Sequence, residues 1–198
     1  MNEFEIIYKS FIDFMETAES YATADEELIS EYGSVLKSDK DEIDIIIEIW
    51  KKDGFCLYKN GLFTFLNPKE YNQTIRNFPE VSDAAEVFAR TATGCVFLWE
   101  EYSFGKNIAF LNIHTGHKNI VSTSFNTMIE WDLPASNFWV DDCYGKVEFL
   151  VINKFRHVPY DKCVGYSLAL ALGGKESIDN MELFNYKTYL ELLSQFHK

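Results

Sequence analysis

The chain has 198 residues, of which 47% are hydrophobic, 16% are aromatic and 25% are charged. So many aromatic side chains exclude a disordered chain, because they can bury ample apolar surface. The formal net charge of −13 disfavours direct binding to nucleic acid, since the phosphates would be repelled. The four cysteines lack the CxxC spacing of zinc knuckles and redox motifs. We therefore expect buried thiols, no metal site and no cofactor.

The acidic excess is concentrated at one end of the chain. Residues 1–50 contain 14 acidic and 3 basic residues, a net charge of −11, whereas residues 51–198 contain 17 acidic and 15 basic residues, a net charge of −2. No stretch approaches the roughly 20 apolar residues of a membrane span. Glu3 and Glu5 stand where a signal peptide carries positive charge. We expect a cytoplasmic protein without a membrane contact, and a partner with a basic surface.

Helical spacing of apolar residues marks the first quarter of the chain. It predicts a helix over 2–16, a second helix opened by a capping box at Thr23-Ala-Asp-Glu, and a third over about 41–52. Gly54 is a natural stop for the third helix.

The period then changes to that of strands. Two apolar runs, 55–58 and 62–66, flank Asn60-Gly61 and predict a hairpin. Asn67-Pro68 predicts the start of a short helix over 69–77. Four short runs separated by turn residues predict an antiparallel meander: 85–90, 95–100, 107–113 and 119–122.

The remainder is predominantly helical by pattern. We interpret 124–131 and 136–155 as helical, 164–172 as a buried strand or helical turn, and 186–196 as an amphipathic helix. Segregated helices and strands predict an α+β fold, with N-terminal helices packed on a mainly antiparallel sheet and C-terminal helices. We divide it into regions 1–83 and 84–198, which could form one compact unit.

Catalytic constellations are weak in this sequence. His114-Thr-Gly-His117 has the pattern of a turn and no acidic third ligand nearby. The pairs Asp141-Asp142 and Glu100-Glu101 do not share one helical face. Gly173-Gly174-Lys175 lacks the spacing of a phosphate-binding loop, and Cys163 is near His157 only in sequence. We expect no enzyme.

Two sets of motifs resemble known families. The first set resembles the GAD-like domain found at the N-terminus of bacterial immunity proteins, and comprises 28–33, 46–55 and 60–71. The second set resembles the C-terminal domain of the type VI secretion immunity family, and comprises 87–99, 112–116, 160–174 and 189–196. His114 stands where the family pattern has Asp, and residues 1–24 show no counterpart.

The resemblance implies a cytoplasmic immunity protein that binds a secreted toxin, such as a nuclease, and neutralises it by stoichiometric occlusion. It supplies no catalytic residues. Because nucleases expose basic clefts, we predict that an acidic surface competes for such a cleft. The predicted contact residues are Asp25, Glu26, Glu27, Glu31, Asp39, Asp41 and Glu42.

The sequence is compatible with two other hypotheses about function. The chain could be an orphan binding or regulatory module of the same fold, without a toxin gene beside its own. It could also be a small hydrolase or ligand-binding protein, with convergent His, Cys or carboxylate groups in a deep pocket. We expect a monomer or weak dimer.

Overall fold

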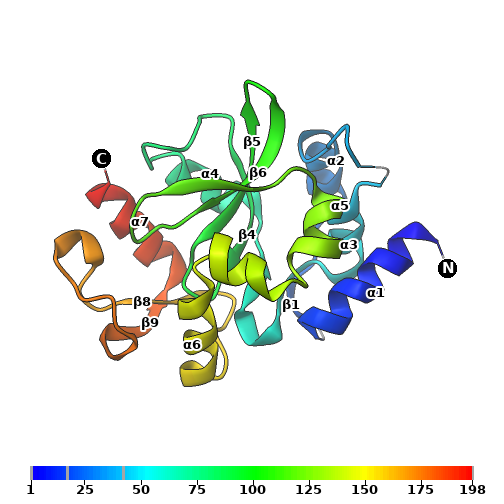
Figure 1. The fold of residues 1–198 in the computed structure, drawn as a ribbon. Helices are drawn as coiled ribbons and strands as arrows, with labels where there is room; N and C mark the ends of the chain where they lie inside the picture. The colour runs from blue at the N-terminus through cyan, green and yellow to red at the C-terminus, as the bar shows by residue number, and fades with distance from the viewer. Residues whose placement is uncertain (1, 17, 42, 198) are drawn as a thin grey trace.

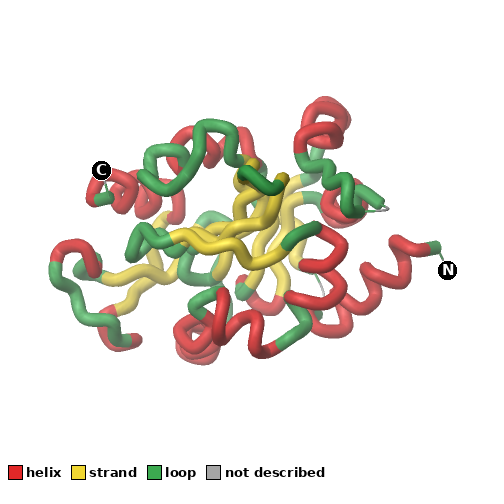
Figure 2. The backbone as a smooth tube through the Cα atoms, turned by 45° about the horizontal axis from the view of Figure 1, so that its top comes forward, coloured by secondary structure: helices red, strands yellow, loops and turns green. Residues whose placement is uncertain are grey.

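The computed structural model describes residues 2–16, 18–41 and 43–197. An antiparallel seven-stranded sheet lies at its centre, and helices lie around it (Figures 1 and 2). The strand order follows the chain: β1 (Glu19–Ala22), β2 (Phe55–Tyr58), β3 (Phe63–Phe65), β4 (Glu86–Thr91), β5 (Val96–Tyr102), β6 (Gly105–Leu111) and β7 (Lys118–Ser122). The predicted α+β class and antiparallel meander are confirmed.

A second, two-stranded sheet and the helices complete the fold. The small sheet pairs β8 (Lys162–Tyr166) with β9 (Met181–Asn185). The α-helices are α1 (Glu3–Met15), α2 (Glu26–Val35), α3 (Ile45–Asp53), α4 (Pro68–Ile75), α5 (Phe125–Thr127), α6 (Gly145–Phe155) and α7 (Tyr186–Phe196). Among the described residues, no helix combines the length and apolarity required to cross a bilayer.

Helix α1 begins where the sequence predicts it. The Asn2 side chain accepts from the backbone amide of Glu5, and the Glu5 carboxylate accepts from that of Asn2. This reciprocal capping satisfies two amides that the first turn would leave free. Phe11 on the buried face packs edge-on against Tyr58, with ring centroids 4.8 Å apart.

Helices α2 and α3 depart from the prediction at their first residues. The cap of α2 is Asp25, whose carboxylate accepts from the amide of Leu28, and not Thr23. Helix α3 begins at Ile45, several residues later than predicted. The reason is that Asp41 is engaged elsewhere: its carboxylate accepts from the backbone amides of Phe125 (2.9 Å) and Asn126 (3.2 Å) at the start of α5.

Replacing Asp41 by Ala should lower the free energy of unfolding by about 1–2 kcal/mol, because two amides of α5 lose a charged acceptor. Urea denaturation followed by circular dichroism measures this loss. Asp39→Ala is the matched control, since Asp39 is exposed, and should stay within about 0.5 kcal/mol of the parent protein. Equal stability of the Asp41→Ala variant and the control would contradict the assigned bond.

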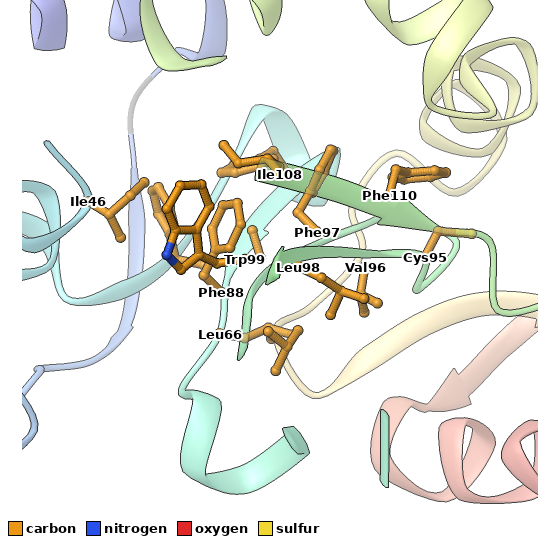
Figure 3. Packing of buried hydrophobic residues seen from close by; sticks show 14 of the residues in the cluster. Ile46, Leu66, Phe88, Cys95, Val96, Phe97, Leu98, Trp99, Ile108 and Phe110 are labelled. Carbon is orange, nitrogen blue, oxygen red and sulfur yellow. The ribbon is translucent and has the colours of Figure 1, made fainter. Parts of the chain in front are cut away.

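The central strands are covered on both faces, so they are buried almost continuously. Figure 3 shows Phe97 projecting from β5 to the side opposite Val96 and Leu98. On the Phe97 side, Trp99 packs against Phe125 of α5 with ring centroids 4.6 Å apart. Helices α4 and α7 pack against each other, and α4 also contacts β4. The polar–apolar alternation typical of a half-exposed strand is therefore missing here.

The C-terminal part differs in detail from its predicted elements. The run 124–131 is α5 followed by a π-helical turn, Met128–Asp132, and the run 136–155 is interrupted between a second π turn, Phe138–Asp142, and α6. The break lies at Tyr144, whose φ of 59° is left-handed and cannot continue a helix. The run 164–172 begins in strand β8 and ends in a 3₁₀ turn, Leu170–Leu172. Strands β1 and β9 were not predicted.

Candidate partner-binding surfaces

The acidic residues predicted to contact a partner cluster in part on α2. Glu26 and Glu27 occupy its first turn and are exposed, where carboxylates interact favourably with the positive end of the helix dipole. Glu31 pairs with Lys69 at 2.6 Å on the surface. With the cap Asp25, these residues place four carboxylates on one exposed helix.

The other three predicted residues do not join that cluster in the same way. Asp39 lines a hollow of about 370 Å³ together with Lys37, Lys40, Lys106 and Glu101, so charges of both signs surround it. Asp41 faces α5, as described above, and Glu42 lies outside the described residues. The contact role of the whole set stays a prediction.

The histidine pair of the 114–117 turn is split between interior and surface. His114 is 2% exposed, and its Nε2 lies 3.1 Å from the carbonyl oxygen of Thr93. Burial lowers the pKa of His114 to about 4. His117 is exposed and lies 3.6 Å from Glu80. Across residues 2–16, 18–41 and 43–197, no three His, Cys, Asp or Glu side chains are grouped so as to hold a metal.

The other sequence candidates for chemistry are also explained by structure. Cys163 is fully buried, and burial raises the pKa of its thiol to about 12, which disfavours the nucleophilic thiolate. His157 bonds instead to Glu19 of β1, at 3.0 Å. Gly174 lies in a tight turn, since a Cβ there would come within 1.8 Å of the carbonyl oxygen of Leu168.

A buried polar network lies at the turn between β4 and β5, and the sequence analysis did not predict it. The amide of Thr93 donates to the carboxylate of Glu148 in α6 at 3.0 Å, and the Thr93 hydroxyl donates to the same carboxylate. Glu148 is fully buried, and burial raises its pKa to about 7. The amide of Val164 donates to the carbonyl of Ala92. This turn therefore inserts between α6 and β8.

Arg90, on strand β4 before the turn, makes a further set of buried polar contacts. Its buried guanidinium donates to the carbonyl oxygens of Thr91 (2.9 Å), Pro159 (3.0 Å) and Tyr160 (2.9 Å). It also lies over the ring of Tyr186, 4.9 Å from the centroid. No sequence signal reveals the contacts with Pro159 and Tyr160, because these partners are backbone atoms about 70 residues away.

An apolar hollow of about 230 Å³ lies between α7 and the segment after β8. Phe184 and Tyr189 stack in its wall, with ring centroids 4.8 Å apart. Leu168, Leu172 and Leu192 also line it and are about half exposed. Its lining is predominantly apolar and includes these exposed leucines.

Two protein-family models match the sequence of this chain. The sequence model of the GAD-like domain matches residues 6–114, more than half of the chain, and that of "T6SS immunity protein Tdi1, C-terminal" matches residues 135–197. The chain belongs to the type VI secretion immunity family. The first match begins at residue 6, so most of α1 lies within the GAD-like region, although the sequence showed no counterpart there.

The fold recurs in a solved structure. The crystal structure of Atu4351 from Agrobacterium tumefaciens superposes with a TM-score of 0.75 and 16% sequence identity, over 95% of this chain and 88% of that one. At this identity the similarity concerns the fold alone. No curated protein matches the chain.

Membership of this immunity family implies binding to a cognate toxin and suggests a non-enzymatic role. In the family's terms, the turn between β4 and β5 belongs to the GAD-like region, whereas Glu148, Pro159, Tyr160 and Val164 belong to the Tdi1-type region. The buried network is thus one of the contacts between the two family regions. The division of the chain at residue 83 stays a prediction.

Proposed function

We propose that this immunity protein binds a cognate secreted toxin of the nuclease class and neutralises it stoichiometrically, by covering the surface on which the toxin holds nucleic acid. The observation that carries the proposal is the match of residues 135–197 to a type VI secretion immunity domain. The charge distribution supports the choice of partner, because a net charge of −11 in residues 1–50 attracts a basic surface. The protein itself then performs no catalysis.

The exposed carboxylates of α2 have a defined part in this proposal. They attract the basic cleft of the toxin from a distance and speed the encounter, since charge complementarity acts mainly on the association rate. Their positions favour this part, because Glu26 and Glu27 are exposed at a helix terminus.

Co-expression tests the function as a whole. The toxin encoded beside the gene of this chain should stop growth when expressed alone and should be harmless when this chain is expressed with it. A purified 1:1 complex without nuclease activity is the expected biochemical counterpart. A toxin that remains lethal and fails to bind the purified chain would overturn the proposal for that pair.

Charge reversal tests the part assigned to α2. Glu27→Lys combined with Glu31→Lys should slow association about tenfold at low salt and make it less dependent on salt. Surface plasmon resonance over a salt series measures both effects. The control is Glu182→Lys combined with Glu191→Lys, two exposed acids on β9 and α7, at the other end of the molecule (Figure 1). Unchanged association of the α2 variant would remove α2 from the encounter.

A further inference from the structure

The two π-helical turns after α5 display an apolar surface that the rest of the fold does not cover. In Figure 1 this lime and yellow segment lies in front of the sheet, between α1 and α6. Ile129, Phe138 and Trp139 are buried beneath it. Trp131 and Val140 point outward instead, with 67% and 40% of their surface exposed. We call Trp131, Val140 and the acids beside them the Trp131 face.

A π turn accounts for this display. It inserts an extra residue into a helical turn and rotates the side chains that follow, and such turns are frequent at functional sites. Here each π turn ends in acids, Asp132 in the first and Asp141-Asp142 in the second. The local geometry thus presents one large aromatic side chain among carboxylates.

The charge of the chain segment that carries Trp131 is of one sign. Residues 119–145 contain Glu130, Asp132, Asp141 and Asp142 and no lysine or arginine. Among the residues that the structure describes, none of these four carboxylates pairs with a cation. Lys118, which precedes the segment, is held by Glu100 at 2.5 Å.

Mutual repulsion within the face supports the same conclusion. Burial raises the pKa of Asp132, and the charge of Asp142 raises it further. Burial also raises the pKa of Asp142, and the charge of Asp141 adds to that effect. Ser122 lowers the pKa of Asp132 in part, but no cation among the described residues pairs with these carboxylates, whereas arginine or lysine side chains of a partner would.

The combination fits a protein partner better than it fits solvent. Exposed tryptophan is uncommon on monomer surfaces, and tryptophan is enriched among the residues that contribute most to binding. Acids around an apolar centre form the polar rim of such an interface and select a basic partner. Val140, Asp141 and Asp142 lie within residues 135–197, the region matched by the immunity domain, and Trp131 lies just before it.

We propose that the Trp131 face is the surface that docks the toxin, with Trp131 inserted into an apolar recess of the partner and the four surrounding carboxylates paired with its arginine or lysine side chains. This inference rests on the proposed function and gives it a location. It separates two steps: the acids of α2 speed the encounter, and the Trp131 face holds the complex.

The test measures the affinity of the full chain for a catalytically inactivated copy of the toxin encoded beside its gene. Trp131→Ala should weaken binding at least tenfold, mainly through faster dissociation. Phe104→Ala is the matched control, because Phe104 is also 67% exposed and lies in the turn between β5 and β6. It should change the affinity less than twofold.

A second pair of variants tests the charges. Asp141→Lys combined with Asp142→Lys should weaken binding at least tenfold, whereas Glu182→Lys combined with Glu191→Lys should leave the dissociation rate unchanged. Circular dichroism of each variant verifies that the fold is retained, which the exposure of the replaced side chains favours.

The outcomes separate the inference from the proposed function. Failure of the parent chain to bind the toxin would overturn the function, and the inference with it. Normal binding by both the parent chain and the Trp131→Ala variant would overturn the inference alone. Light scattering of the chain without toxin tests whether a second copy of the chain occupies the face instead. A dimer that dissociates in the Trp131→Ala variant would assign the face to that second copy and would also overturn the inference.

Discussion

Replacing Arg90 by Met should destabilise the protein by about 3–5 kcal/mol, the cost of breaking a fully buried charged network. Met fills much of the space but donates no hydrogen bond. The carbonyl oxygens of Thr91, Pro159 and Tyr160 would each lose a donor, and buried acceptors without partners cost about 1–3 kcal/mol. The cation–π contact with Tyr186 would also be lost.

The effect should concentrate at the contact between the two family regions. Urea unfolding measures the loss of stability, and limited proteolysis should find new cleavage near 155–161, where the bonded carbonyls lie. Arg156→Met is the matched control, because Arg156 is exposed, and should cost no more than about 0.5 kcal/mol. If Arg90→Met is as stable as Arg156→Met, the buried guanidinium does not hold the two regions together.

Replacing Glu148 by Gln should increase stability at pH 8 and not at pH 4.5. The pKa of Glu148 is raised from 4.5 in the unfolded chain to about 7 in the folded one. Between these values the folded state keeps a proton that the unfolded state has released, so stability falls as the pH rises. The difference corresponds to about 3 kcal/mol, because one pKa unit is worth about 1.4 kcal/mol. Gln can accept from the Thr93 amide through its Oε1 and can donate from its amide nitrogen to the Thr93 hydroxyl oxygen, and it carries no such proton.

Titration of His114 changes the stability with pH in the opposite direction, over an overlapping range of pH. Its pKa is lowered from 6.5 to about 4 on folding, so its contribution to stability is present above pH 6.5 and is lost as the pH falls toward 4. The two slopes oppose each other between pH 4.5 and 6.5. The Glu148→Gln variant should therefore show a rise in stability across this range that the parent protein conceals.

Urea denaturation of the parent protein and the Glu148→Gln variant at pH 4.5, 5.5, 6.5 and 8 measures the difference in their free energies of unfolding. The contributions of the surface carboxylates are the same in both proteins and cancel from this difference. The free energy of unfolding of the variant minus that of the parent should grow as the pH rises from 4.5 to 8. The His114→Gln variant should show the fall in stability with rising pH that Glu148 causes, because the opposing contribution of His114 is absent. A difference that does not vary with pH would show that Glu148 is already ionised in the folded protein at neutral pH.

Local signals in the sequence predicted most of the helices and the meander. The apolar spacing of α1, the Asn67-Pro68 start of α4 and the Asn60-Gly61 turn are local features, so they are visible in the chain itself. The start of α3 could not be predicted. It depends on Asp41 bonding to α5, about 84 residues further along the chain.

Elements stabilised by distant partners had no local pattern. Strand β1 is exposed at every residue and shows no alternation, so only its pairing with β2 defines it. Similarly, β9 is defined by β8. Helix α6 is separated from the preceding π turn by the left-handed Tyr144, and the next residue, Gly145, packs against the carbonyl of Trp139, where a Cβ would come within 2.0 Å. Each case is a tertiary contact that overrides local preference.

The same division applies to the candidate surfaces. The acidic character of α2 was visible because charge is a property of sequence, and exposed helix termini tolerate carboxylates. Trp131 stood in a run interpreted as helical, and sequence does not reveal which face of an irregular helix is left uncovered. Glu148 resembled any carboxylate on a helix, and its burial depends on the turn at Thr93.

The sequential strand order has a consequence for the way the chain folds. Each strand of the large sheet pairs with its neighbour in sequence, so the sheet can grow progressively while synthesis continues, and the connections from β4 to β7 are short. The turn at Thr93 is different, because its amide and hydroxyl find their acceptor only when α6 has been made. Until then this turn is a polar segment next to an incomplete core. Closure of residues 145–165 onto it is therefore a late step.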